Sequence, residues 1–273
     1  VTFSDVNTIG ATTAFSDTLN TLDSDSTLTL DGNTVTYVTG GETLTVTDAD
    51  TLNTGSATDD VTVISNSTHD LNTGAGDDTL TVNAGATLTG AADLGTGADT
   101  LDLSAVTTDV DVTVTTANAD GFGGTFAGIT GGFAGMDTLL TNAANSNGLD
   151  VSALAGTFSV GGATDTFTTG GNTLTFTHLD RFTGGANNQT LQLLSGATIN
   201  SFDGGAGADT LDYSGYGAAV SLDVTGINFP NGHNGTATGL TSGFSNVNAV
   251  IGSALADAIT GPNFDTSVTL TGT

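Results

Sequence analysis

The chain has 273 residues, of which 29 are acidic and 1 is basic, so its formal net charge is −28. A surface with so few cations cannot neutralise phosphate, which excludes nucleic-acid binding as a main role and attraction to an anionic membrane surface. The sequence has no cysteine, which excludes a disulfide scaffold. No apolar stretch approaches the ~18 residues of a spanning helix, so no membrane insertion is expected.

The charge balance predicts a bound cation. Mean hydropathy is +0.11 and 37% of residues are hydrophobic, which argues against the disorder that a high net charge often indicates. Repulsion among uncompensated negative charges destabilises a compact form. Carboxylate and carbonyl oxygens prefer hard ions, so Ca²⁺ is the expected cofactor. Because the chain starts at Val1 without Met or a signal-like apolar stretch, we expect a processed product or an excised fragment.

Short strands with one buried face are predicted along the chain. The pattern is a polar residue, Thr, Leu, any residue and an apolar residue, in which the apolar residues point to one side and Thr to the other. It occurs at 26–30, 42–46, 78–82, 99–103, 172–176, 189–193 and 209–213. Thr, Val and Leu without blocks of Lys, Glu or Ala favour strand over helix.

The strands follow one another at the period of a solenoid coil. Six apolar positions are 8, 9, 10, 9 and 8 residues apart, with Gly, Asn and Asp between them: Leu44, Leu52, Val61, Leu71, Leu80 and Leu88. A strand-plus-turn period of about nine residues is typical of a parallel β-roll or β-helix, whose stacked coils share a thin core. The predicted fold is therefore an all-β parallel β-roll or β-helix solenoid. The alternative is an antiparallel sandwich with frequent turns.

A larger repeat divides this solenoid into two tandem modules. Residues 40–70 align without gaps to 170–200, with 10 identical pairs among 31, and residues 97–114 align to 207–224. The blocks keep their order, with insertions or deletions between them, and the two copies join near Gly148. We therefore predict two calcium-binding solenoid modules, the first over residues 1–148 and the second over residues 149–273.

Three turns share the pattern Gly-x-Gly-x-Asp-x-Leu, at 74–80, 95–101 and 205–211. The glycines allow a tight turn with positive φ, the aspartate adds a carboxylate oxygen, and the leucine begins the strand. Inward-pointing carbonyls and one carboxylate form half of a calcium cage, which a neighbouring coil completes. The candidate ligands are two glycines and one aspartate from each turn: Gly74, Gly76 and Asp78; Gly95, Gly97 and Asp99; Gly205, Gly207 and Asp209.

Weaker copies of the turn add further candidate ligands. Asp59 lies in the copy at 54–61, Asp257 lies in the copy at 252–259, and Asp203 precedes the third strong copy. Asp59, Asp78 and Asp99 are 19 and 21 residues apart, close to one two-turn coil, whereas Asp209 has no strong neighbour. Complete cages are therefore expected in 54–101 rather than around 205–212. The alternative for each aspartate is a turn residue that bonds its own backbone. In the copy at 184–191, Gln189 replaces the aspartate, so we expect a structural coil without metal there.

These turns resemble the RTX (haemolysin-type) calcium-binding nonapeptide of secreted bacterial proteins, Gly-Gly-x-Gly-x-Asp-x-(large apolar)-x. Residues 204–212 fit every fixed position, and the other two strong copies lack only the first Gly. The phrases at 209–223 and 244–254 also resemble giant repeat-containing bacterial adhesins and surface-layer proteins. The resemblance covers most of 40–261. It implies calcium ions between stacked loops and folding after export, with any active site in another domain.

Catalysis and ice binding are the weaker interpretations. Polysaccharide lyases with a parallel β-helix need a base and a cationic group to stabilise an enolate. The chain offers one Arg, three His and no Lys or Trp, and we expect His178 and Arg181 to be solvated residues on a strand and its turn. Thr-x-Thr pairs could form a ladder, as in ice-binding β-helices, but their rows are interrupted and Thr is favoured at outward strand positions in any case. The pairs lie at 27/29, 34/36, 43/45, 79/81 and 87/89.

The function predicted from the sequence is a non-enzymatic, calcium-stabilised structural or adhesive module of a bacterial surface protein, filament or surface layer. We expect it to be secreted, and to be extracellular or on the cell surface. Self-association, or association with neighbouring modules, is expected because both ends, Val1–Phe3 and Ser267–Thr271, are strand-like and uncapped. The alternative is a calcium-folded secretion module attached to a separate enzymatic domain.

Overall fold

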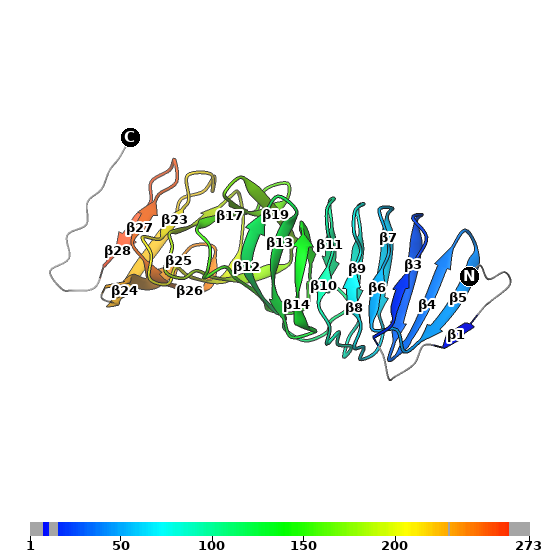
Figure 1. The fold of residues 1–273 in the computed structure, drawn as a ribbon. Helices are drawn as coiled ribbons and strands as arrows, with labels where there is room; N and C mark the ends of the chain where they lie inside the picture. The colour runs from blue at the N-terminus through cyan, green and yellow to red at the C-terminus, as the bar shows by residue number, and fades with distance from the viewer. Residues whose placement is uncertain (1–7, 11–15, 229, 262–273) are drawn as a thin grey trace.

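The chain winds into an elongated solenoid whose two sheets run along its length (Figure 1). The computed structural model describes residues 8–10, 16–228 and 230–261, so the strand-like segments expected at Val1–Phe3 and Ser267–Thr271 lie outside the described residues. Within these ranges every regular element is a strand, and no helix is long and apolar enough to cross a membrane. The predicted all-β solenoid is confirmed.

Each sheet contains 14 strands among the described residues. Sheet A contains, in spatial order, β1 (Thr8–Gly10), β5 (Glu42–Thr47), β4 (Thr34–Thr39), β3 (Ser26–Asp31), β7 (Asp59–Val63), β9 (Thr79–Val82), β11 (Thr100–Asp102), β15 (Thr138–Leu140), β19 (Asn172–Thr177), β18 (Asp165–Thr169), β17 (Gly156–Val160), β21 (Gln189–Leu193), β23 (Thr210–Asp212) and β27 (Ala249–Ile251). Sheet B contains β2 (Thr18–Asn20), β6 (Thr51–Asn53), β8 (Asp70–Asn72), β10 (Ala92–Asp93), β14 (Ile129–Met136), β13 (Gly121–Phe126), β12 (Asp111–Asn118), β16 (Asn147–Asp150), β20 (Leu179–Thr183), β22 (Ile199–Asp203), β26 (Leu240–Val247), β25 (Gly232–Ala237), β24 (Ser221–Asn228) and β28 (Ala258–Thr260).

The core is a thin apolar layer between the two sheets. The leucines predicted to point inward are all 0% exposed: Leu80, Leu101, Leu174, Leu191 and Leu211. In-register parallel pairing stacks them into columns, because side chains at equivalent positions face the same side. The second half of the core is richer in aromatic rings, and the ring centroid of Phe158 lies 4.8 Å from those of both Phe167 and Phe182.

Four antiparallel meanders of three strands each interrupt the parallel stack. Strands β3–β5 and β17–β19 form two of them in sheet A, and β12–β14 and β24–β26 form two in sheet B. These meanders were not predicted, because a strand alternates in the same way in a hairpin and in a coil. The hairpin signal was present as Gly40-Gly41, which joins β4 to β5 with φ of 56° and 84°.

The order of strands repeats along the chain. Each repeat begins with a meander in sheet A, continues to a meander in sheet B and closes with one coil, which is β15–β16 in the first repeat and β27–β28 in the second. The first repeat has one extra coil, β9–β10. Both sheets continue without a break past Gly148, which lies in β16.

Candidate functional site

Four aspartates stack along the corner at which the chain enters sheet A. Asp59 begins β7, and Asp78, Asp99 and Asp137 immediately precede β9, β11 and β15. These strands are parallel and in register, with Asp60 opposite Thr79 and Thr100 opposite both Thr79 and Thr138. The residues just before them therefore form one column, which we call the aspartate column.

Three of the four carboxylates of the column accept a backbone N–H from the preceding coil. The N–H of Asp59 donates to Oδ1 of Asp78 at 2.8 Å, and the N–H of Asp78 donates to Oδ1 of Asp99 at 2.8 Å. The N–H of Asp99 donates to Oδ2 of Asp137 at 3.1 Å. The hydroxyl of Ser26 donates to Oδ1 of Asp59 and ends the column. These aspartates therefore join neighbouring coils, whereas the sequence suggested, as the alternative to metal binding, that they bond their own backbone.

The other oxygen of three of these carboxylates is buried without a hydrogen-bond partner. Asp59, Asp78 and Asp99 are 0%, 1% and 0% exposed, and Oδ2 of each has no partner. Burial, together with the nearby carboxylates of Asp78 and Asp137, raises the pKa of Asp99 to about 7. Burial also raises the pKa of Asp78. A buried carboxylate with a free oxygen is costly, so a proton or a cation would stabilise this corner.

The predicted glycines let adjacent loops approach closely. A Cβ at Gly95 would lie 1.8 Å from the carbonyl oxygen of Gly74, and one at Gly97 would lie 1.7 Å from that of Gly76. The Gly74 carbonyl also accepts the N–H of Thr96 at 2.9 Å. A carbonyl oxygen has two lone pairs, so this hydrogen bond leaves one available. The loops are thus lined with carbonyl oxygens beside the aspartate column.

The second module contains a single carboxylate at the equivalent corner. Asp209 is 0% exposed, its Oδ1 accepts the N–H of Gln189 at 2.7 Å, and its Oδ2 has no partner. Burial raises the pKa of Asp209 to about 6. The neutral Gln189 occupies the place of an aspartate and donates to the Leu154 carbonyl at 2.6 Å. A Cβ at Gly205 would lie 2.6 Å from the Gly185 carbonyl oxygen, so this loop is also closely stacked.

Asp203 and Asp257 are satisfied by other groups. Oδ1 of Asp203 accepts the Gly205 N–H at 3.0 Å and the Asn246 amide at 2.7 Å. Asp257 is exposed and lies just before β28, at a corner of sheet B. Its carboxylate accepts the N–H of Val220 and both the N–H and the hydroxyl of Ser253, and these hydrogen bonds lower its pKa. The structure therefore does not bring Asp257 to the aspartate column.

Asp137 and Asn248 belong to this corner and were missed. Asp137 accepts the N–H of Asp99, and Oδ1 of Asn248 accepts the N–H of Asp209 at 2.8 Å. The sequence carries a signal for Asp137, because 137–139 repeats the Asp-Thr-Leu of 78–80 and 99–101. The Gly-x-Gly turn is missing there, since β14, a meander strand, ends at Met136, directly before it.

The oxygen donors fit a hard cation held between coils. Ca²⁺ takes about six to eight oxygen ligands. No group of three His, Asp or Glu side chains is placed to hold a metal within 8–10, 16–228 and 230–261. A calcium ion here would therefore draw on one free carboxylate oxygen per coil and on carbonyl oxygens of the 74–78 and 95–99 loops. The unpartnered Oδ2 atoms and the loop carbonyls are oxygen donors of the kind that such a set requires.

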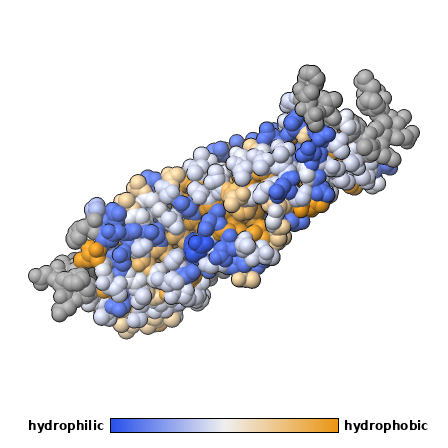
Figure 2. Space-filling model, turned by 90° about the horizontal axis from the view of Figure 1, so that it is seen from below, coloured by the Kyte–Doolittle hydropathy of each residue, from blue (hydrophilic) through white to orange (hydrophobic). Residues whose placement is uncertain are grey.

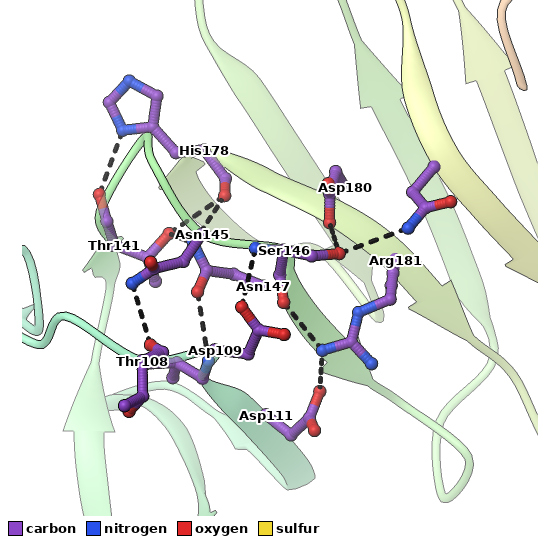
Figure 3. A network of polar contacts seen from close by, with 12 residues as sticks. Thr108, Asp109, Asp111, Thr141, Asn145, Ser146, Asn147, His178, Asp180 and Arg181 are labelled. Atoms are coloured by element: carbon purple, nitrogen blue, oxygen red, sulfur yellow. Dashed lines mark hydrogen bonds and ion pairs between the residues drawn. The ribbon is translucent and has the colours of Figure 1, made fainter. Parts of the chain in front are cut away.

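The one basic side chain of the chain is engaged at the joint between the two repeats (Figure 3). Nη2 of Arg181 donates to Oδ1 of Asp111 at 2.7 Å and to the Ser146 carbonyl at 2.8 Å. Buried Asn147 donates to the His178 carbonyl at 3.0 Å and accepts the N–H of Val110 at 3.1 Å. His178 is exposed, as expected, and joins this network through its backbone carbonyl, whereas Arg181 is only half-exposed and its guanidinium is engaged.

Comparisons with known proteins name no family for this arrangement. No protein-family model matches the chain, and no curated protein matches it significantly. The resemblance to RTX repeats rests on the residues of the three turns.

Proposed function

We propose that the chain is a non-enzymatic structural or adhesive module of a bacterial surface protein, filament or surface layer, stabilised by Ca²⁺ and working outside the cell. One observation carries the proposal. In a chain with 29 acidic residues and 1 basic residue, the aspartate column holds three buried carboxylates, each with an oxygen that has no partner. The chain has no side-chain cation to spare for them, so a bound cation is the simplest source of compensating charge.

Asp78 and Asp99, with the carbonyls of their loops, are the groups that would hold the ion. Calcium supplies positive charge and binds the oxygens that the hydrogen bonds between coils leave free. Sites of this kind in extracellular modules bind at roughly 10⁻⁴–10⁻³ M, so the module is stable where calcium is abundant and weak where it is scarce. This behaviour suits a protein that folds after export.

The repeated architecture supports a mechanical role. Two repeats share one continuous core and one pair of sheets, which gives an elongated rod. Among the described residues, both sheets end in strands that pair on one side only, so association with copies of itself or with neighbouring modules would extend the rod. The alternative, a calcium-folded secretion module beside a separate enzymatic domain, differs in what the parent chain contains. Mass spectrometry of the native assembly identifies the parent chain and its partners.

Thermal melting tests the role of calcium. Each site that binds only the folded form adds about 2.7 kcal/mol at a hundredfold excess of calcium over its Kd. We expect millimolar calcium to raise the melting temperature strongly above that in chelator. Magnesium should do so weakly, because it demands tighter octahedral geometry. The same melting curve in calcium and in chelator would refute the calcium proposal.

A second candidate, binding to ice, is favoured by one observation. Strand pairing aligns five half-exposed threonines in adjacent strands of sheet A, and they form an unbroken row: Thr45, Thr36, Thr29, Thr62 and Thr81. In the described part of the chain none of these hydroxyls bonds another residue. The row that looked interrupted in the sequence is therefore continuous in space.

An ice-recrystallisation assay separates this candidate from the first. Charge in the middle of the row would disturb an ordered water layer, so Thr29→Lys with Thr62→Lys should abolish any inhibition of ice growth. The same substitutions should leave calcium-dependent melting unchanged, because these side chains lie on the outer face of sheet A. Ice growth that is unaffected by the native protein rules this candidate out.

A further inference from the structure

The last coil of the solenoid exposes apolar side chains. The described part of the chain has six exposed large apolar residues, and four of them lie in β27, in β28 or in the loop between them: Val250, Ile251, Leu255 and Ile259, at 37%, 48%, 55% and 46%. Figure 2 shows apolar surface at this left-hand end, beside the grey atoms. Among the described strands, β27 and β28 each pair on one side only. Apolar side chains on free strand edges mark a surface that takes a partner.

The equivalent coil of the first repeat shows how such a surface is covered. Strands β15 and β16 follow the first sheet-B meander as β27 and β28 follow the second. Leu139 lies opposite Leu101, and Val250 lies opposite Leu211. Leu139 and Val250 therefore hold equivalent positions in the two repeats. β15 is covered by β19 and β16 by β20, which leaves Leu139 and Leu149 at 0% and 1% exposure.

The N-terminal coil is a third example of the same arrangement. Ile9 of β1 lies opposite Val46 of β5, as Leu139 of β15 lies opposite Phe176 of β19. The alignment of the repeats places Val46 at the position of Phe176. Strands β2 and β6 reproduce the register of β16 and β20 in sheet B in the same way. Strands β5 and β6 therefore form a surface that accepts a closing coil, and β1–β2 occupies it.

We propose that β27–β28 of one copy docks on β5 and β6 of a second copy and replaces that copy's β1–β2. Strand direction and register are those that β15 and β16 already adopt on β19 and β20. In each sheet one three-residue strand replaces another, so the strand pairing is conserved. The gain is the burial of Val250 and Ile259, which are exposed in the separate chain.

The contact is head-to-tail, because the C-terminal end of one copy engages the N-terminal half of the next. A head-to-tail contact along one axis does not close, so repeated docking builds a filament. The inference deepens the self-association in the proposed function, and it does not require that calcium bind at the aspartate column.

Disulfide trapping tests the register, because the chain has no cysteine of its own. Ala258 of β28 holds the position that Gly148 of β16 holds in the first repeat. Gly148 lies opposite Arg181 of β20, and the alignment of the repeats places Arg181 at the position of Thr51 of β6. Docking therefore places Ala258 of one copy opposite Thr51 of the other. Cα atoms on adjacent strands lie about 5 Å apart, which is within disulfide range. Ala258→Cys protein is mixed with Thr51→Cys protein in millimolar calcium, oxidised and separated on a denaturing gel.

We expect a cross-linked heterodimer several-fold more abundant than with Thr81→Cys, an outward position in the middle of sheet A. Adding Ile259→Asp to the Ala258→Cys chain should remove the product. Adding Ile64→Asp, which changes an exposed apolar residue far from both ends, should leave it. A mixed product no more abundant than with Thr81→Cys overturns the inference. A product with Thr18→Cys of β2 instead also overturns it, because it shows stacking without exchange.

The melting curves test the calcium proposal independently of the cross-linking experiment. A missing cross-link with calcium-dependent melting rejects only the docking, and a cross-link with calcium-independent melting rejects only the calcium site.

Discussion

The backbone N–H of Asp78 donates a hydrogen bond of 2.8 Å to Oδ1 of Asp99, the residue that holds the same place one coil further along. This bond uses one carboxylate oxygen to align two coils and leaves Oδ2 of Asp99 buried without a partner. The same group therefore specifies the stacking and creates the need for a proton or a cation.

The variant in which Asn replaces both Asp78 and Asp99 should be more stable than the native protein in chelator and less stable than it in calcium. The amide oxygen of Asn still accepts the N–H of the preceding coil, as Asn248 does for Asp209. In chelator the double variant loses two costly buried charges, so its free energy of unfolding should rise by about 1–3 kcal/mol per site. In calcium it should be less stable than the native protein, because the ligands are gone. Urea unfolding with and without calcium measures both changes.

Asp60→Asn is the matched control, because Asp60 is exposed and lies on the outer face of β7. It removes one charge from the same region without touching the column. If it changes the calcium response as much as the double variant does, general charge repulsion and not the column governs stability.

Without calcium, stability should fall as the pH rises from about 4 to about 7. The pKa of Asp99 is raised from 3.8 to about 7 in the folded chain. Between these values the folded chain keeps a proton that the unfolded chain has released, so raising the pH favours unfolding, and the effect levels off above pH 7. Asp209, with its pKa raised to about 6, adds the same trend over a narrower range.

Calcium should remove most of this pH dependence, because it binds the deprotonated carboxylates. The difference between the melting temperatures in calcium and in chelator should therefore be small near pH 4 and largest above pH 7. Melting curves across this range check the trend. A calcium effect of equal size at both ends of the range contradicts the assignment of the ion to these buried aspartates.

Gly97→Ala should destabilise the protein far more than Gly85→Ala. Both glycines have positive φ, of 150° and 76°, so each substitution strains the backbone by about 1–2 kcal/mol. A Cβ at Gly97 would also lie 1.7 Å from the Gly76 carbonyl oxygen, whereas nothing lies within 4 Å of one at Gly85. We expect the loss for Gly97→Ala to exceed that for Gly85→Ala by at least about 2 kcal/mol, the cost of overpacking. Equal losses in urea unfolding show that the loops do not stack this closely.

Asn147→Ala should weaken the joint between the repeats more than Arg181→Gln. Removing the buried Asn147 amide leaves the Val110 N–H and the His178 carbonyl without their partner, which costs about 1–3 kcal/mol per group. The bond of Arg181 to Asp111 is solvent-exposed, and such ion pairs are worth about 0–1 kcal/mol. Urea unfolding of the two variants ranks them, and a larger loss for Arg181→Gln places the strength of the joint in the ion pair.

The sequence by itself determined the fold class and the corner residues. Alternation of apolar residues with threonine is local, so it predicts strands and buried leucines such as Leu80 without knowledge of their neighbours. The Gly-x-Gly-x-Asp turn is also local, and it correctly marks Asp78, Asp99 and Asp209 as residues at the start of strands. These features follow from two to nine consecutive residues.

Only the tertiary structure decided which coil lies beside which. Register between coils joins residues that are distant along the chain, such as Arg181 and Asp111, which are 70 residues apart. Local alternation is the same in a parallel coil and in an antiparallel meander, so the four meanders do not follow from it. The place of Asp137 in the aspartate column, the free oxygen of Asp99 and the exposed last coil all depend on this non-local pairing. Hydrogen bonds between strands and the shared core fix that pairing, and a single coil holds too few of either to specify it alone.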